Sequence, residues 1–319
     1  MTIRDEVLSV LESFLAGWAS GDEKSLGHAF HASASIHSSA HGDAVGAENI
    51  AALLAADHGM PMPLQLVSTN QYVAGNASHT VLTAYLFGHV TDPTASAPAV
   101  FGAVLVADLT RGEDGWRFSD LKLSIPWTDG DPSRFSRWKL LPGQGWKLGD
   151  PTPTIVSELD SPWARGVPPL ASTDAVQQVA DAYARYAWAI DQGDIHLLRG
   201  CYTEDAFGEF PPMGHRDGRH EIIGQQKEFR RNWPWMQHFG RPLSIEVGAD
   251  ETTANMIVGR IIPQSPHTRD GQDIYGAHYQ LGLRREQGEW RISYFDYRPG
   301  WITNGKKLGS ATALFHQSG

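Results

Sequence analysis

Residues 176–194 read VQQVADAYARYAWAIDQGD, and residues 7–22 read VLSVLESFLAGWASGD. In both stretches apolar residues recur every three or four positions, and each run ends in a Gly-Asp pair. This pattern is typical of an amphipathic helix that stops at a glycine. The two Gly-Asp pairs lie 172 residues apart. The chain therefore repeats a helical unit at this offset.

The repeat extends to the far end of each copy. Both copies close on two apolar runs joined by a polar five-residue turn, at 101–118 and 275–292, an offset of 174 residues. Such spacing predicts a β-hairpin. Earlier strands are predicted at 35–38 and 80–90 in the first copy, and at 206–210 and 253–262 in the second. Helices followed by strands predict a duplicated α+β fold, with the helices on one face of a curved antiparallel sheet.

These patterns divide the chain into four segments. The first domain is expected at 1–128 and the second at 172–303, with a tail at 304–319. The segment 129–171 is rich in Pro and Gly and holds three tryptophans, which a solvated linker would not retain. We expect an ordered strap across a domain or a neighbouring subunit; a floppy linker is the alternative.

Composition excludes several classes of protein. The 319 residues carry a net charge of −10, which argues against non-specific nucleic-acid binding. The single cysteine, Cys201, rules out an internal disulfide framework. Neither a membrane span nor a signal pattern is evident, so we expect no membrane partner and a cytoplasmic location. The 11 Trp, 12 Phe and 9 Tyr suit thick cores, the interface of a homo-oligomer, or a pocket for an apolar ring-bearing ligand.

Each copy resembles the NTF2-like superfamily, in its SnoaL-like branch. The resemblance rests on the first helix ending in Gly-Asp, on a leucine followed four residues later by Tyr or Phe, and on the Trp-Arg-Ile or Trp-Arg-Phe of the closing hairpin. It implies two tandem cone-shaped α+β barrels, each with a pocket between helices and sheet. It implies little about activity, because this scaffold hosts several reactions as well as non-catalytic binders.

The second copy is more specific. Its first helix is similar to that of scytalone dehydratase, bile-acid 7α-dehydratase and hexachlorocyclohexane dehydrochlorinase. The resemblance implies a catalytic dyad of Asp191 and His238. At the same offsets the first copy carries Ala19 and Leu64, which cannot transfer a proton. We therefore expect the first domain to be structural, or to supply walls to the other pocket.

A dyad of this kind suits proton abstraction. A neutral imidazole is the side chain best matched to a base at neutral pH, and a carboxylate on its other nitrogen fixes the tautomer. Tyr186 and His278 are the candidates to assist a leaving group or a carbonyl. Candidate substrate-binding residues are Tyr183, Trp188, Phe210, Arg230, Trp235, Tyr279, Tyr294 and Asp296. Core packing of the tyrosines, an interface histidine or tryptophan, and a surface ion pair of Asp296 are the alternatives.

Metal and cofactor chemistry find little support in the sequence. His215 and His220, with Asp217 and Glu221, form a local cluster, but the spacing matches none of the strong zinc signatures. Dinucleotide-binding, phosphate-loop and serine-hydrolase motifs are lacking. We expect no metal and no cofactor. The leading hypothesis is a cofactor-independent lyase or isomerase for a small hydrophobic or aromatic molecule. The alternatives are a non-catalytic binding or assembly module and a polyketide cyclase-like protein.

Overall fold

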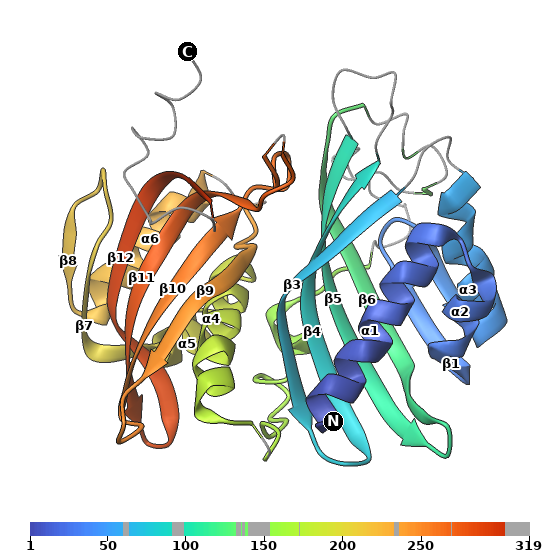
Figure 1. Ribbon diagram of the computed structural model, residues 1–319, viewed down its shortest axis with the longest axis horizontal. Coiled ribbons are helices and arrows are strands. Elements are labelled where there is room, and N and C mark those ends of the chain that lie inside the picture. Colours follow the sequence, from blue (N-terminus) through green and yellow to red (C-terminus); the bar gives the residue numbers. More distant parts are fainter. Residues whose placement is uncertain are drawn as a thin grey trace, which may run out of the picture. The chain divides into compact units, whose positions relative to one another are not determined.

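The computed structural model describes residues 1–59, 64–90, 99–131, 135, 138–139, 154–171, 173–232, 236–268 and 270–303. The chain forms two compact units, Met1–Ser172 and Thr173–Gly319. Each unit holds one six-stranded sheet with helices packed against it (Figure 1). The fold is thus a tandem pair of NTF2-like α+β domains.

The first unit has helices at its start and strands after them. Its helical elements are α1 (Ile3–Ser20), α2 (Glu23–His28), α3 (Ala47–Ala55), and the 3-10 turns η1 (Ala56–Gly59) and η3 (Glu158–Asp160). Its strands are β1 (Phe30–Ser38), β2 (Gly42–Val45), β3 (Leu64–Gly75), β4 (His79–Val90), β5 (Ala99–Gly112) and β6 (Gly115–Asp129).

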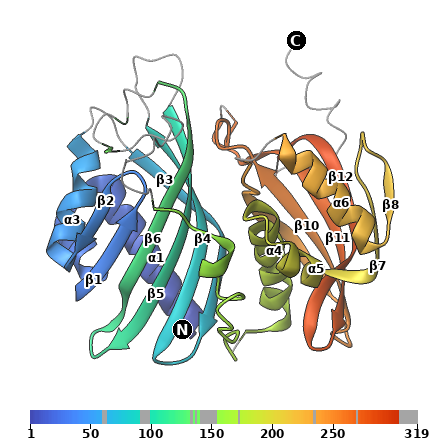
Figure 2. The same ribbon diagram turned by 180° about the vertical axis from the view of Figure 1, so that it is seen from behind.

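The second unit repeats this order. Its helices are α4 (Ala175–Asp191), α5 (Ile195–Cys201) and α6 (Arg219–Arg231). Its strands are β7 (Tyr202–Glu209), β8 (His215–Asp217), β9 (Gly240–Val247), β10 (Thr253–Ile261), β11 (Ile274–Glu286) and β12 (Glu289–Thr303). The three helices lie on one face of the sheet (Figure 2).

The two sheets have the same topology. The strand orders are β2-β1-β6-β5-β4-β3 and β8-β7-β12-β11-β10-β9. One pairing in each sheet departs from the antiparallel expectation, because β1 pairs with β6, and β7 with β12, in parallel. A parallel pair needs a crossover, and here the rest of the unit supplies it: the chain leaves β1 and returns as the last strand.

The repeated Gly-Asp pair has a local explanation. Gly21 adopts the left-handed conformation (φ 66°) and ends α1, and Gly193 (φ 70°) follows α4 in the same conformation. The aspartate that follows caps the next helix: the Asp22 side chain accepts from the backbone N–H of Lys24, and Asp194 accepts from that of Leu197. Glycine tolerates this conformation without steric cost, and aspartate is a favoured N-cap.

The closing hairpin of the second unit is tighter than the sequence suggested. The expected five-residue turn reduces to Gln287 and Gly288, with the strands β11 and β12 extending to either side. Both residues have positive φ, 54° and 86°. Two such residues match the right-handed twist of the flanking strands, which lets the hairpin close in two residues.

Part of the segment between the domains packs on the first sheet. The Trp163 ring stacks on Tyr72 of β3, with ring centroids 4.4 Å apart. The Arg165 guanidinium makes two hydrogen bonds to Asp108 of β5, at 2.7 and 2.9 Å. Lys122 of β6 donates to Asp160 at 2.7 Å. Residues 154–171 therefore lie along the outer surface of the first sheet.

Each unit has its own apolar core. In the first, Val7, Leu11, Phe14 and Trp18 of α1 are all fully buried at helical spacing. Within the described residues, no helix is both long and apolar enough to cross a bilayer.

Candidate active site

Asp191 and His238 form a buried hydrogen-bonded pair in the second unit. Asp191 is the last residue of α4, and its side chain is 2% exposed. Its Oδ1 lies 2.6 Å from His238 Nδ1, and its Oδ2 accepts from the His238 backbone N–H, also at 2.6 Å. This two-point contact fixes both the position and the ring orientation of the histidine.

Arg230 also holds Asp191 in place. It lies near the C-terminal end of α6, and its Nη1 donates to Asp191 Oδ1 and to the backbone oxygen of Met236, both at 3.2 Å. Its Nη2 donates to the backbone oxygen of Asp191. One guanidinium therefore joins the ends of α4 and α6 to the segment that carries His238.

The environment favours a neutral imidazole. Burial lowers the pKa of His238, and the nearby positive charges of Arg260 and Arg230 lower it further, against the opposing effect of Asp191. An ionised carboxylate only accepts hydrogen bonds, so Nδ1 carries the proton. Nε2 is then the ring nitrogen able to accept a proton from another molecule.

A tyrosine ring packs against the histidine ring. The Tyr186 ring meets the His238 ring edge-on, with centroids 5.9 Å apart. Gln226 of α6 donates to the hydroxyl oxygens of Tyr186 (3.2 Å) and Tyr202 (2.8 Å). Burial raises the pKa of Tyr186 well above its ordinary value, so its hydroxyl stays protonated at neutral pH.

A second tyrosine pair supports the histidine backbone. Tyr183 Oη donates to the His238 backbone oxygen at 3.2 Å. The ring centroids of Tyr279 on β11 and Tyr183 are 6.2 Å apart. The Tyr279 hydroxyl oxygen accepts a hydrogen bond from Arg260 Nη1 at 3.0 Å. A Cβ on Gly240 would collide with the Tyr183 ring, so a residue without a side chain is required at the start of β9.

Aromatic side chains complete the surroundings. The ring centroid of Phe295 on β12 lies 5.4 Å from that of Tyr186 and 5.1 Å from that of Tyr279. Phe210 stacks on the Phe295 ring, with centroids 5.3 Å apart. Trp188 is buried in α4, three residues before Asp191. The Tyr186 ring that meets His238 thus belongs to an aromatic cluster that includes Phe295 and Phe210.

Three predicted residues lie elsewhere. Tyr279 faces the helices, so strand alternation puts its neighbour His278 on the opposite face of the sheet. Tyr294 and Asp296 of β12 share that outer face: Tyr294 packs on Phe207, and Asp296 pairs with Arg298 at 2.7 Å. His278, predicted to be catalytic, and Tyr294 and Asp296, predicted to bind substrate, therefore lie on the face away from the Asp191–His238 pair, and Asp296 makes the ion pair that was the alternative. Trp235 lies outside the described residues.

His278 itself is unusual. It is 6% exposed, neither ring nitrogen has a hydrogen-bond partner within the described part of the chain, and burial lowers its pKa, as does Arg298. It is a buried histidine on the outer face of the sheet, away from Asp191 and His238.

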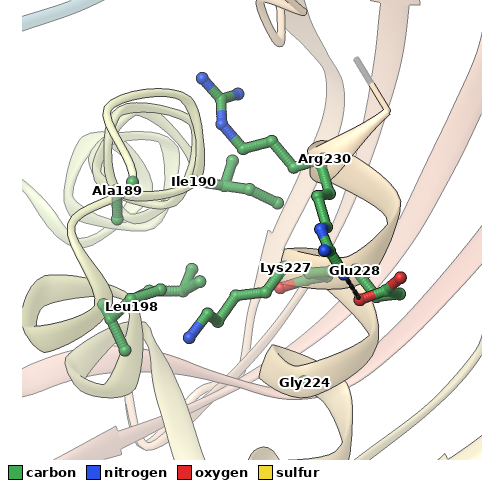
Figure 3. A pocket seen from close by; sticks show the side chains of 11 residues that line it. Ala189, Ile190, Leu198, Gly224, Lys227, Glu228 and Arg230 are labelled. Atoms are coloured by element: carbon green, nitrogen blue, oxygen red, sulfur yellow. Dashed lines mark ion pairs between the residues drawn. The ribbon is translucent and has the colours of Figure 1, made fainter. Parts of the chain in front are cut away.

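A pocket of about 640 Å³ opens between the three helices of the second unit. Its walls include Ile190, Leu198 and Lys227, together with Gln226 and Arg230 (Figure 3). The last two also contact the tyrosines and Asp191, so the pocket adjoins the dyad through them.

One family model covers most of the chain. The SnoaL-like domain model matches residues 1–122 and again 171–296. The chain belongs to the SnoaL-like family. The two matched segments correspond to the two structural units.

Solved structures similar to this SnoaL-like protein each span about one of its domains. A putative aromatic ring hydroxylase from Novosphingobium aromaticivorans has 14% identity and a TM-score of 0.37, covering 41% of this chain and 95% of its own. A hexachlorocyclohexane dehydrochlorinase has 19% identity and a TM-score of 0.35, over 40% and 86%. A putative scytalone dehydratase from N. aromaticivorans has 7% identity and a TM-score of 0.37, over 45% and 95%. No curated protein matches the chain significantly.

The first SnoaL-like domain carries a different polar centre. Ala19 lies in the last turn of α1 and Leu64 begins β3, so the Asp191–His238 pair has no counterpart at these positions. Instead Asp57, which is 1% exposed, accepts from the indole N–H groups of Trp18 (2.9 Å) and Trp138 (3.2 Å). Its Oδ2 also lies 2.8 Å from His41 Nε2.

Ser38 extends this centre, with its Oγ 2.7 Å from His41 Nδ1. The order Ser-His-Asp matches that of a nucleophilic triad, but the three residues are at most 3% exposed. Phe135 stacks on the Trp138 ring at 4.5 Å and covers the group. The sequence offered one faint signal, Ser38 three residues before His41, and nothing that connected either residue to Asp57.

Within the described residues, no group of three or more His, Cys, Asp or Glu side chains is placed to hold a metal ion. In the loop cluster, His215 contacts Glu209 at 2.8 Å, and the backbone N–H of Asp217 donates to Glu221. These contacts hold the β7–β8 hairpin to the start of α6.

Proposed function

We propose that the second domain is a lyase of the elimination type, or an isomerase, in which His238 is the general base and Asp191 orients it. The hydrogen bonds from both His238 N–H groups to one buried carboxylate carry this proposal. The substrate would be a small, ring-containing apolar molecule, since the Tyr186 ring beside His238 belongs to an aromatic cluster with Phe295 and Phe210.

The chemistry follows from the tautomer. His238 Nε2 takes a proton from carbon, and the electron pair of the broken C–H bond forms a double bond. In elimination the leaving group departs from the adjacent carbon; in isomerisation the proton returns at another carbon. Asp191 stabilises the imidazolium formed in the first step without taking the proton itself.

The hydroxyl groups of Tyr186 and Tyr202 are suited to the oxygen side of the reaction. Gln226 donates to both hydroxyl oxygens, and the two hydroxyls also hydrogen-bond to each other, so one hydroxyl proton of the pair remains to point at a carbonyl or a departing oxygen. Such preorganised donors stabilise developing negative charge in a site that excludes water.

The base can be tested before the natural substrate is known. Nitrobenzisoxazole loses its ring proton to a base, its N–O bond breaks, and a coloured cyanophenolate forms. We expect the protein to accelerate this reaction, and His238→Gln to lower the rate at least a hundredfold, since a positioned base contributes roughly 10²–10⁴. His220→Ala, which removes an exposed histidine from α6, is the matched control.

Two outcomes would refute the proposal. One is equal rates for the wild type and His238→Gln when both show the same thermal unfolding. The other is tight binding of ring-bearing molecules without any chemical change, which would favour the non-catalytic binding module.

A further inference from the structure

The pocket between α4, α5 and α6 is lined by more basic than acidic side chains. Three cationic side chains line it, Lys227, Arg230 and Arg231, against a single acid, Glu228. The whole chain has the opposite balance, with 36 acidic and 26 basic residues. The pocket is therefore a small positive region on an acidic protein.

Two of the three cations are already neutralised. Arg230 pairs with Asp191 at 3.2 Å, and Arg231 pairs with Glu228 at 3.6 Å. Lys227 differs, since no carboxylate of the described residues pairs with it. Figure 3 shows its side chain reaching from α6 toward α5, where Leu198 lies. One uncompensated ammonium group thus stands at the wall of the pocket.

Apart from Gln226, the rest of the lining is apolar. Ala189 and Ile190 of α4 and Ile195 and Leu198 of α5 line the pocket. Figure 3 shows Ile190 and Leu198 on the side opposite α6, which carries Lys227. A volume of about 640 Å³ is in the range of small-molecule sites. An apolar wall opposite a single cation is complementary to a molecule with a hydrophobic ring and one negative group.

We infer that this pocket binds a small aromatic or alicyclic carboxylate, with its ring on Ile190 and Leu198 and its carboxylate on the Lys227 ammonium. This goes beyond the proposed function, because the ligand occupies the pocket between the helices, which His238 does not line. The site needs no turnover in order to bind.

Arg230 connects the two sites. It lines the pocket, and it also holds Asp191, which in turn holds His238. The charged and titratable groups that act on His238 are Asp191 from α4, Arg230 from α6 and Arg260 from β10. A carboxylate held on Lys227 adds a negative charge to the pocket that Arg230 lines, so binding raises the proton affinity of His238.

The test uses naphthoate and its neutral analogue naphthamide on the full chain. Calorimetry should show naphthoate binding about fivefold more tightly than naphthamide, the preference expected of one partly exposed ion pair. Lys227→Met should remove this preference. Lys24→Met, which makes the same change on exposed α2 of the first domain, should retain it.

Two NMR measurements place the ligand. Saturating naphthoate should raise the pKa of His238, whereas naphthamide should not, and naphthoate should show Overhauser contacts to the Ile190 and Leu198 methyl groups. Equal binding of both compounds, a preference that survives Lys227→Met, or contacts elsewhere would overturn the inference. Because all these are equilibrium measurements, an inactive dyad would not affect them.

Discussion

The Asp191 carboxylate accepts from both the backbone N–H and the ring Nδ1–H of His238, each at 2.6 Å, across 47 residues of chain. The backbone contact places the residue and the ring contact orients it. An acid that holds a histidine in this way determines which ring nitrogen carries the proton.

Asp191→Asn tests the orientation. The amide occupies the same volume but can donate where the carboxylate only accepts, so the ring is free to adopt the other tautomer. We expect the nitrobenzisoxazole rate to fall by roughly 10²–10⁴ while binding weakens little. Steady-state kinetics separate the two effects. A fall in affinity alone would contradict the orienting role.

Stability should depend on pH through His238. The pKa of His238 is lower in the folded protein than its ordinary value of about 6.5, so the unfolded chain binds the proton more readily. This contribution is fully present above pH ~6.5 and is lost as the pH falls through that value toward the folded pKa. Denaturant unfolding of wild type and His238→Gln between pH 5 and 8 should show a shallower acid limb in the variant. Parallel curves would argue against this effect.

Arg230→Met should move the pH–rate profile. The variant keeps an unbranched side chain but removes a positive charge that lowers the pKa of His238. The midpoint of the acid limb of kcat/KM should therefore shift to higher pH. Arg199→Met, on exposed α5, should leave it in place. If Arg230 only held the helices together, stability would fall without any movement of the midpoint.

Gly240→Ala should disturb the site through Tyr183. The added methyl group overlaps the Tyr183 ring, whose hydroxyl holds the His238 backbone. We expect a loss of about 1–3 kcal/mol in the free energy of unfolding, and slower turnover. Gly200→Ala is the matched control, because a Cβ there meets open space in α5. Equal behaviour of the two variants would show that Tyr183 can move freely.

Asp57→Ala tests the first domain. The change leaves two indole N–H groups and His41 without their shared acceptor in a buried place. Stability should fall by about 3–5 kcal/mol, as for one partner removed from a buried pair. Asp114→Ala, in an exposed turn, should cost little. Calorimetry should show the loss in the first domain alone, with probe turnover by the second unchanged at low temperature.

The sequence was most informative where local chemistry determines structure. Helix ends at Gly21 and Gly193 and the twofold repeat follow from spacing alone. The Asp191–His238 contact came from resemblance, since a separation of 47 residues carries no geometric information by itself. Alternation in β11 showed that Tyr279 and His278 point apart, but only packing against α4 decides which of them faces inward.

The parallel pairing of β1 with β6 and the Asp57 centre were not predicted, for the same reason. Both depend on contacts between distant segments, and isolated Ser, His, Asp and Trp residues have no spacing signature when each comes from a different element. A binding role for Lys227 could not be predicted, because an exposed lysine on a helix has no distinguishing sequence pattern until the other residues that line the pocket are known.

The Asp57 centre is buried and covered by Trp138 and Phe135, so this part of the first domain's interior is closed. A reactive interior must stay partly open and hold destabilising groups, and such a site limits how stable a domain can become. A domain copy that does not convert a substrate can fill its interior with its own aromatic side chains. The two halves should therefore differ in mutational tolerance: substitutions in the first should affect protein abundance, and those in the second should affect turnover.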